Sequence, residues 1–277
     1  MKKKYEYTDQ HYDVWLQWNL TSQCNFGGDY CFGKTPPNRQ TIFSIDIDAL
    51  IKTLTVTGKT FRIGFTGGEP FLIPNFVDAC KELTSSHYVS FNSNLVLDDV
   101  IYFAKVINPA RVFSIHASLH FKELIDKGLF RKFVHHYKLL EEAGFNIYAE
   151  AIGYPSALNK INDYKSLAVS NGINFSFAPF FGDYNNKFYP AAYTEEEINL
   201  FELDKENIWA HYQQGNICNA GYTAAVVSPT DNISPCFNVT GDLGAIYKSI
   251  NLNESNITCP AAKCGCPLNY YEERGRR

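Results

Sequence analysis

Hydrophobic positions along the chain follow two spacings. Six short runs rich in β-branched and aromatic residues predict strands, at residues 14–20, 61–66, 88–92, 112–117, 145–152 and 174–179. Longer segments repeat apolar residues at helical spacing and predict helices, at residues 44–57, 73–85, 97–107, 121–143, 161–171 and 194–213. Gly58, Gly144 and Gly172 each stand just past a helical segment, where glycine commonly ends a helix. We therefore expect strands and helices to alternate.

Six strand–helix units in this order predict an α/β fold with a parallel sheet. Six units are fewer than the eight of a closed barrel, so we expect a partial (β/α)6 barrel. Ligands of such sheets bind at the carboxyl ends of the strands. We therefore expect one binding site at this edge of the sheet.

The pattern changes near Gly215. Cysteine, asparagine, glycine and proline dominate the rest of the chain, and the helical spacing disappears. Two apolar runs around the polar turn 229–232 predict a hairpin. We expect two domains, a barrel of residues 1–214 and a small cysteine-rich C-terminal appendage of residues 215–277.

Composition and charge narrow the classes of function. The 277 residues are 45% hydrophobic and 15% aromatic, enough to bury a sizeable core. A net charge of -4 gives no indication of nucleic-acid binding. No apolar run reaches the roughly 18 residues of a membrane span, and no signal-peptide core follows the N-terminal lysines. We expect a cytoplasmic protein without a nucleic-acid or membrane partner.

Seven of the eight cysteines form two groups. Cys24 and Cys31 form the first, and the second consists of Cys218, Cys236, Cys259, Cys264 and Cys266. Clustered cysteines in a cytoplasmic chain indicate a metal more often than a disulfide. Cys80 stands alone in an apolar helical segment and is expected to be a buried core thiol.

The first group lies in the segment 24–31, CNFGGDYC. This is the pattern C-x3-C-x2-C with Gly28 in place of the middle cysteine. Thiolates on a short glycine-containing loop suit an iron–sulfur cluster. The plainer interpretation is an ordinary pair of loop cysteines.

Polar and glycine residues follow the second to fifth predicted strands. Gly67 and Gly68 allow the backbone to approach a ligand closely, and the Glu69 carboxylate can accept hydrogen bonds from an ammonium group of that ligand. The alternative interpretation is a tight turn with a capping acid. Alternation places His116, Ser118 and His120 on one face, and Glu150 lies on the fifth strand. The candidates are Gly67, Gly68, Glu69, Pro70, Asn92, Ser93, Asn94 and Ser118.

Residues 19–33 and 66–70 resemble the radical S-adenosylmethionine (radical SAM) superfamily. The resemblance implies a 4Fe–4S cluster, with Cys24 and Cys31 as two of three ligands, whose free iron binds S-adenosylmethionine. It also implies that the turn at residues 67–70 holds the amino group of the cofactor. Residues 92–94 would contact its carboxylate or ribose, and Ser118 would touch the cofactor or the substrate. Tyr30 or Phe32 would stack beside its adenine.

Residues 218–266 resemble the twitch domain, a shortened SPASM domain in which four cysteines frame an auxiliary 4Fe–4S cluster. Cys218, Cys236 and Cys266 are the firmest candidates, with Cys259 or Cys264 as the fourth ligand. The alternative is a structural zinc site, which also takes four thiolates.

The resemblance implies an enzyme. An external electron donor would reduce the cluster, and a 5′-deoxyadenosyl radical would then modify a peptide, sugar or other small molecule. Because Gly28 removes one ligand, we expect weak or absent cleavage. The alternatives are a degenerate binding or scaffold protein that retains the C-terminal metal site, and an active enzyme in which residue 28 has been changed.

Overall fold

One open sheet organises the computed structural model, which describes residues 11–31, 44–205 and 214–261. Its strand order is β11-β10-β1-β2-β3-β4-β5-β6, and every neighbouring pair is parallel except β10 with β11. The six predicted strands are all present, as β1 (Val14–Thr21), β2 (Phe61–Gly67), β3 (Tyr88–Ser93), β4 (Val112–Ser118), β5 (Ile147–Gly153) and β6 (Phe175–Pro179). Over the described residues the sheet stays open and does not close on itself, so the predicted α/β partial barrel is confirmed.

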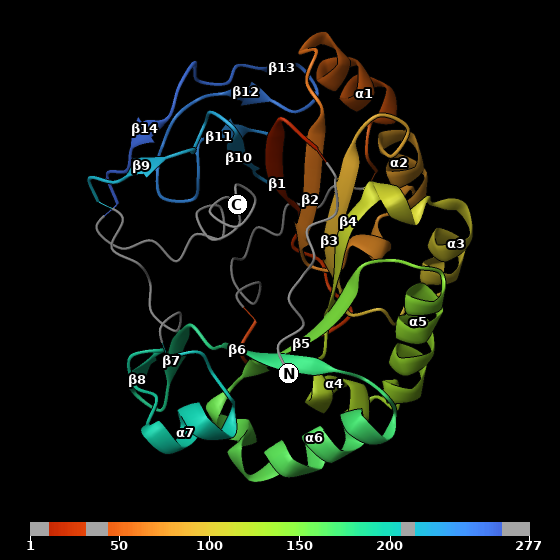
Figure 1. Ribbon diagram of the computed structural model, residues 1–277, viewed down its shortest axis with the longest axis vertical. Helices are drawn as coiled ribbons and strands as arrows, with labels where there is room; N and C mark the ends of the chain where they lie inside the picture. The colour runs from red at the N-terminus through yellow and green to blue at the C-terminus, as the bar shows by residue number, and fades with distance from the viewer. Residues whose placement is uncertain (1–10, 32–43, 206–213, 262–277) are drawn as a thin grey trace.

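Helices cover the outer face of this curved sheet, while the concave face turns toward the C-terminal strands and the β7–β8 hairpin (Figure 1). The helices are α1 (Ile47–Val56), α2 (Phe76–Leu83), α3 (Asp99–Val106), α4 (Phe121–Asp126), α5 (Phe130–Glu142), α6 (Ile161–Ser170) and α7 (Glu195–Leu200). The short 3-10 turns are η2 (Pro70–Leu72), η3 (Pro109–Arg111) and η4 (Pro155–Lys160), and the hairpin is β7 (Gly182–Tyr184) with β8 (Lys187–Tyr189).

Two helix predictions are corrected. The segment 121–143 contains two helices, because the chain turns at Gly128, whose φ of +67° ends α4. The last helix begins as expected, with a capping box between Thr194 and Glu197, but α7 ends at Leu200. Glu202, with φ of +54°, turns the chain away, and residues 206–213 lie outside the described residues.

The main core lies between the sheet and the helices. Phe71, on η2, contacts Phe76 edge-to-face at 5.1 Å and Phe91 at 5.6 Å, measured between ring centroids. Phe91 in turn contacts Phe103 at 5.1 Å. These edge-to-face pairs fasten the turn after β2 to β3 and α3. Cys80 is fully buried in the same core, as predicted.

A histidine of α5 belongs to this core. His136, on α5, is buried, and its Nδ1 lies 2.7 Å from the carbonyl oxygen of Leu95. Burial lowers the pKa of His136 and favours the neutral ring. Its neighbour His135 is exposed.

Two strands of the C-terminal segment extend the main sheet. β10 (Ala224–Val227) pairs in parallel with β1, and β11 (Ile233–Ser234) completes the predicted hairpin. Ala225 and Val227 belong to the main core. The other strands of the segment are β9 (Ile217–Cys218), β12 (Gly244–Ala245), β13 (Ser249–Ile250) and β14 (Ile257–Thr258). A division into two domains near residue 215 therefore stays a proposal.

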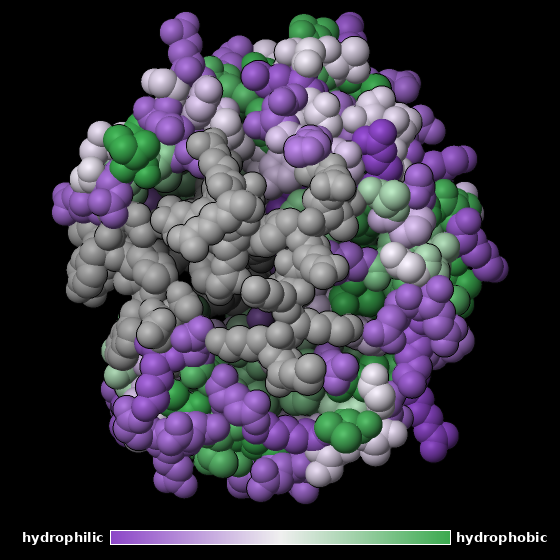
Figure 2. Space-filling model, viewed as in Figure 1, coloured by the Kyte–Doolittle hydropathy of each residue, from purple (hydrophilic) through white to green (hydrophobic). Residues whose placement is uncertain are grey.

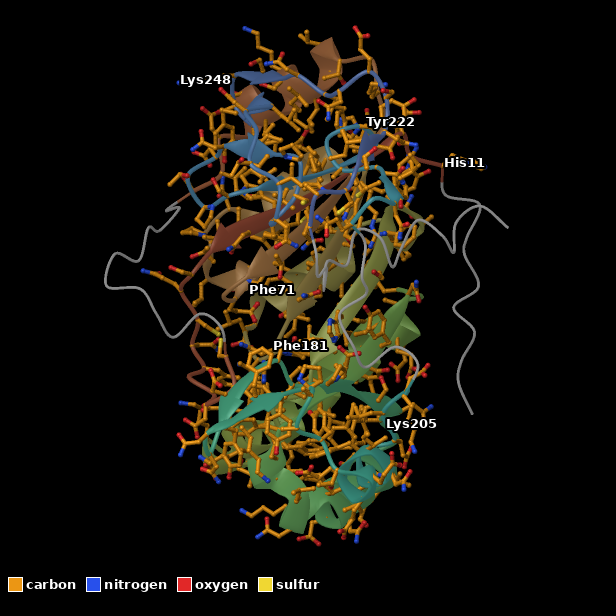
Figure 3. All side chains as sticks on the ribbon, turned by 90° about the vertical axis from the view of Figure 1, so that its left-hand side faces the viewer. His11, Phe71, Phe181, Lys205, Tyr222 and Lys248 are labelled. Atoms are coloured by element: carbon orange, nitrogen blue, oxygen red, sulfur yellow. The ribbon has the colours of Figure 1, made fainter. Side chains whose placement is uncertain are left out.

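The two ends of the molecule come from different parts of the chain. Tyr222 and Lys248 lie at one end, Lys205 lies at the other, and Phe71 and Phe181 lie between them (Figure 3). Hydrophilic residues dominate the described outer surface in Figure 2, with hydrophobic residues in separate patches. Within the described residues, no helix combines the length and the hydrophobicity needed to cross a membrane.

Replacing Val227 by alanine tests the union of β10 with the main sheet. Val227 is 1% exposed and lies beside Trp18, so we expect a loss of about 2 kcal/mol in the free energy of unfolding. Val169→Ala is the control, because Val169 is 74% exposed on α6 and its replacement should change little. Denaturant unfolding measures both. A Val227→Ala variant as stable as the control would contradict the shared core.

Candidate functional site

The turn after β2 is paired with the loop after β1. The N–H of Gly68 donates to the carbonyl oxygen of Thr21 at 2.5 Å, and the N–H of Glu69 donates to that of Gln23 at 2.8 Å. A Cβ on Gly68 would lie 1.8 Å from the Gln23 carbonyl oxygen, so only glycine permits this approach. Gly67 has φ of +120°, and a Cβ there would lie 2.3 Å from the Thr21 carbonyl oxygen. The pairing brings Cys24 toward Glu69.

Glu69 points inward and ties this turn to the end of β3. Its side chain is 1% exposed and accepts hydrogen bonds from the Ser93 hydroxyl (2.8 Å), the Asn94 N–H (2.8 Å) and the Phe71 N–H (3.2 Å). Burial outweighs these three donors and raises the pKa of Glu69 to about 7. Pro70 follows at the first position of η2, where its missing N–H costs nothing.

Cys24 lies at the centre of a small polar network. The N–H of Phe26 donates to its Sγ at 3.4 Å, and Nδ2 of Asn94 lies 3.9 Å from the same sulfur. The Asn94 amide also donates to Oδ1 of Asn25 at 2.7 Å. Burial raises the pKa of the Cys24 thiol, and the nearby Glu69 adds to this against the hydrogen bonds from Phe26 and Asn94. Cys24, Glu69 and Asn94 therefore share one edge of the sheet.

The far end of the loop is held by an aromatic contact. The hydroxyl of Tyr30 lies 2.7 Å from Nδ1 of His120, and the two rings stack with centroids 5.7 Å apart. Cys31 is exposed, and its N–H donates to the carbonyl oxygen of Gly28 at 3.1 Å. Burial lowers the pKa of His120 to about 4, so its ring is neutral at pH 7.

The thiolate set of this loop is one short of the three that the resemblance implies. A Cβ at Gly28 would lie 3.3 Å from Cζ of Tyr30, and glycine places no donor there. In the described part of the chain, no group of three His, Cys, Asp or Glu side chains is arranged to hold a metal ion. The described residues therefore do not fit a three-thiolate cluster, and we derive no step through one.

Polar side chains continue across the concave face at the strand ends. Asn92 is exposed and donates to Oγ1 of Thr66 at 3.3 Å, whereas Ser93 is buried. Ser118 is half-buried and stands in register with Glu150 on β5. His116, two residues before Ser118 on the same strand, forms a polar pair with the same Glu150.

This pair joins His116 to Glu150, with Nε2 and Oε2 3.1 Å apart. The His116 ring also stacks on Tyr148 at 4.9 Å. Ile115 and Ala117 are buried, whereas His116 and Ser118 are only half-buried, so β4 alternates as expected. The concave face therefore offers hydrogen-bonding groups to a polar ligand.

The second cysteine group is described in part. Cys218 on β9 pairs with Ile257 of β14, and Cys259 follows two residues later. Cys218 and Cys236 pack in a small cluster with Trp15, on the concave side. Cys264 and Cys266 lie outside the described residues. The assignment of four cysteines to an auxiliary site stays a prediction.

The structure adds contacts that sequence reasoning missed. Asn25 meets Asn94, and the rings of Tyr30 and Tyr154 are 5.4 Å apart. The bond from Tyr30 joins residues ninety positions apart in the chain. No local pattern signals such a pairing.

Gly68→Ala should disrupt the pairing of the two loops. The added Cβ would collide with the Gln23 backbone, so we expect a loss of several kcal/mol in the free energy of unfolding, within the range for strained or overpacked sites. Gly27→Ala is the matched control, because a Cβ there meets nothing within 4 Å. Thermal unfolding compares them. Equal melting temperatures would show that the approach of the loops is not tight.

Glu69 predicts a pH dependence of stability. Its folded pKa of about 7 lies above the ordinary 4.5, so its stabilising effect is complete below pH 4.5 and is lost as pH rises through 7. Wild type should therefore lose up to about 3 kcal/mol relative to Glu69→Gln between pH 5 and 8. Denaturant unfolding at several pH values measures the difference. Parallel profiles would contradict the raised pKa.

Comparisons with known proteins concern the fold. No protein-family model matches the chain, and no curated protein matches its sequence. Among solved structures, native anSMEcpe with bound AdoMet is similar over 87% of this chain and 80% of its own, with a TM-score of 0.63 and 19% identity. Streptococcus suis SuiB bound to its precursor peptide SuiA is similar over 88% of this chain and 65% of its own, slightly under two thirds, with a TM-score of 0.55 and 16% identity.

A second structure of SuiB is bound to S-adenosylmethionine, and its TM-score is also 0.55. At these identities the likeness concerns the fold alone. This chain, with its mostly parallel sheet and helices on the outer face, shares its overall fold with these proteins. The chain shares the fold of these proteins, two of which are solved with bound AdoMet or S-adenosylmethionine.

Proposed function

We propose that this chain is a radical SAM-type enzyme that binds S-adenosylmethionine at the carboxyl edge of its sheet. The observation that carries the proposal is the convergence of the Cys24 loop with the turn at Glu69, in the fold of proteins solved with this cofactor. Ligands of parallel sheets bind at this edge. When bound, the cofactor would supply the radical chemistry, and the protein would supply binding, orientation and exclusion of water.

The predicted cofactor residues have two roles, contact with the cofactor and support of the residues that make this contact. Tyr30, Asn92 and Ser118 are the contacts, because each is at least partly accessible at the concave edge. The turn of residues 67–70, together with Ser93 and Asn94, supports them, because Glu69, Ser93 and Asn94 are buried and bonded to one another. The cofactor then meets a preformed edge rather than a flexible loop.

The substrate we propose is a peptide or a polar small molecule placed on the concave face. SuiB, which shares the fold, is solved with its precursor peptide. The half-buried His116 and Glu150 offer hydrogen bonds to amide or hydroxyl groups. Electrons would come from an external donor. The localisation we propose is cytoplasmic.

Gly28 favours a second function. Two thiolates hold a 4Fe–4S cluster less firmly than three, and soft sulfur ligands are what cluster iron requires. A chain that keeps the fold and the cofactor edge without this ligand would serve as a binding or scaffold protein. Its C-terminal cysteines would retain an auxiliary 4Fe–4S cluster or a zinc ion.

Gly28→Cys separates the two functions. We expect the variant, reconstituted anaerobically with iron and sulfide, to hold about four more irons per chain than wild type and to form 5′-deoxyadenosine with a reductant. The backbone accepts the change if the Tyr30 ring moves by a few tenths of an ångström. Iron, sulfide and zinc analysis, with chromatography of the nucleoside product, are the measurements.

Gly27→Cys is the matched control. It adds a thiol one position away, in open space, without completing the C-x3-C-x2-C pattern. Equal iron and product in both variants would show that position 28 is not a ligand position. Full cleavage by wild type would discard the scaffold function, and zinc without iron in all three proteins would discard the auxiliary cluster.

A further inference from the structure

We propose that aromatic contacts, rather than a bound metal, hold the loop of residues 24–31 in place, with Tyr30 and His120 as the positioning residues. The inference rests on the proposed function in one respect: the loop is taken to belong to the proposed cofactor site. Nothing in it requires iron or S-adenosylmethionine to be bound. It accounts for how the loop keeps its shape although residue 28 supplies no ligand.

His120 contacts two aromatic residues of the loop. Its ring stacks on Tyr30 with centroids 5.7 Å apart, and the Tyr30 hydroxyl lies 2.7 Å from its Nδ1. The ring of Phe26 meets the same imidazole edge-to-face at 5.8 Å. His120 immediately precedes α4 on the rigid frame of the sheet and helices. One fixed side chain therefore grips two residues of the loop.

Tyr30 also covers the position of the missing ligand. Its Cζ is the heavy atom nearest to a Cβ built on Gly28, at 3.3 Å. The Tyr30 ring also packs against that of Tyr154, which precedes η4, with centroids 5.4 Å apart. The N–H of Cys31 closes the turn onto the Gly28 carbonyl oxygen. Protein atoms therefore surround position 28, the position at which the C-x3-C-x2-C pattern would place a third thiolate.

The start of the loop has its own attachment. Thr21 and Gln23 accept the two backbone hydrogen bonds from the turn after β2, and Oδ1 of Asn25 accepts from Asn94. Together with the His120 contacts, these bonds fix the loop near both cysteines. The two thiols are held in position before any metal arrives.

The test measures cysteine accessibility in metal-free protein kept in chelator, without cofactor. Iodoacetamide labels the thiols, and peptide mass spectrometry follows Cys24, Cys31 and Cys80 separately. In wild type we expect half-buried Cys24 to react at least about tenfold more slowly than in urea-unfolded protein, and exposed Cys31 to react quickly. Cys80, fully buried, reports any global unfolding.

Tyr30→Ala should accelerate labelling of Cys24 about tenfold while Cys80 stays protected, because the loop opens locally. Tyr30→Phe keeps the ring and should accelerate it less than about threefold. Tyr102→Ala is the matched control, since Tyr102 is partly exposed on α3, far along the chain from the loop, and should change neither rate.

Two results would overturn the inference: wild-type Cys24 labelled as fast as in urea, or Tyr30→Ala labelled no faster than wild type. If Tyr30→Ala also exposes Cys80, His120→Gln decides, since it removes the ring while keeping a polar side chain before α4. Faster labelling of Cys24 with Cys80 protected supports the inference, and unchanged labelling overturns it. Failure to bind iron or cofactor would contradict the proposed function without altering these rates.

Discussion

The candidate site depends on the close approach of two loop backbones, one after β1 and one after β2. Their two hydrogen bonds exist because Gly68 has no side chain to separate them. The inward Glu69 carboxyl then joins the same turn to the end of β3. Three neighbouring strands thus end in one bonded unit, and the cysteine loop starts from it. Every role assigned to Cys24 or Asn94 assumes this unit.

Much of the architecture was readable from hydrophobic spacing, for a physical reason. β1, β2 and β3 are buried on both faces over much of their length, so their apolar residues form short runs that mark each strand. Adjacent parallel strands end at the same edge, which is why motifs forty residues apart meet near Cys24 and Glu69. The break at Gly128 was missed, because apolar spacing continues on both sides of it.

The remaining features depend on contacts between distant residues. The sequence places a carboxylate after a glycine pair, but its inward direction follows from where Ser93 and Asn94 happen to lie. His136 is buried because its helix face meets the Leu95 carbonyl oxygen. The pairing of Tyr30 with His120 and that of β10 with β1 join segments with no shared local pattern. Tertiary packing, rather than local sequence, determines these side-chain directions and pairings.

The place of β1 inside the sheet affects how the chain is synthesised. β2, one of its neighbours, follows soon after it, but β10, the other, is about two hundred residues further along the chain. While the ribosome adds the residues between them, one edge of β1 carries unpaired backbone groups that invite mispairing with other strands. Completion of the nascent sheet must wait for the hairpin that contains Val227. A ribosome that stalls before that hairpin would hold a chain in which β1, a largely buried strand of the finished sheet, is still open to aggregation.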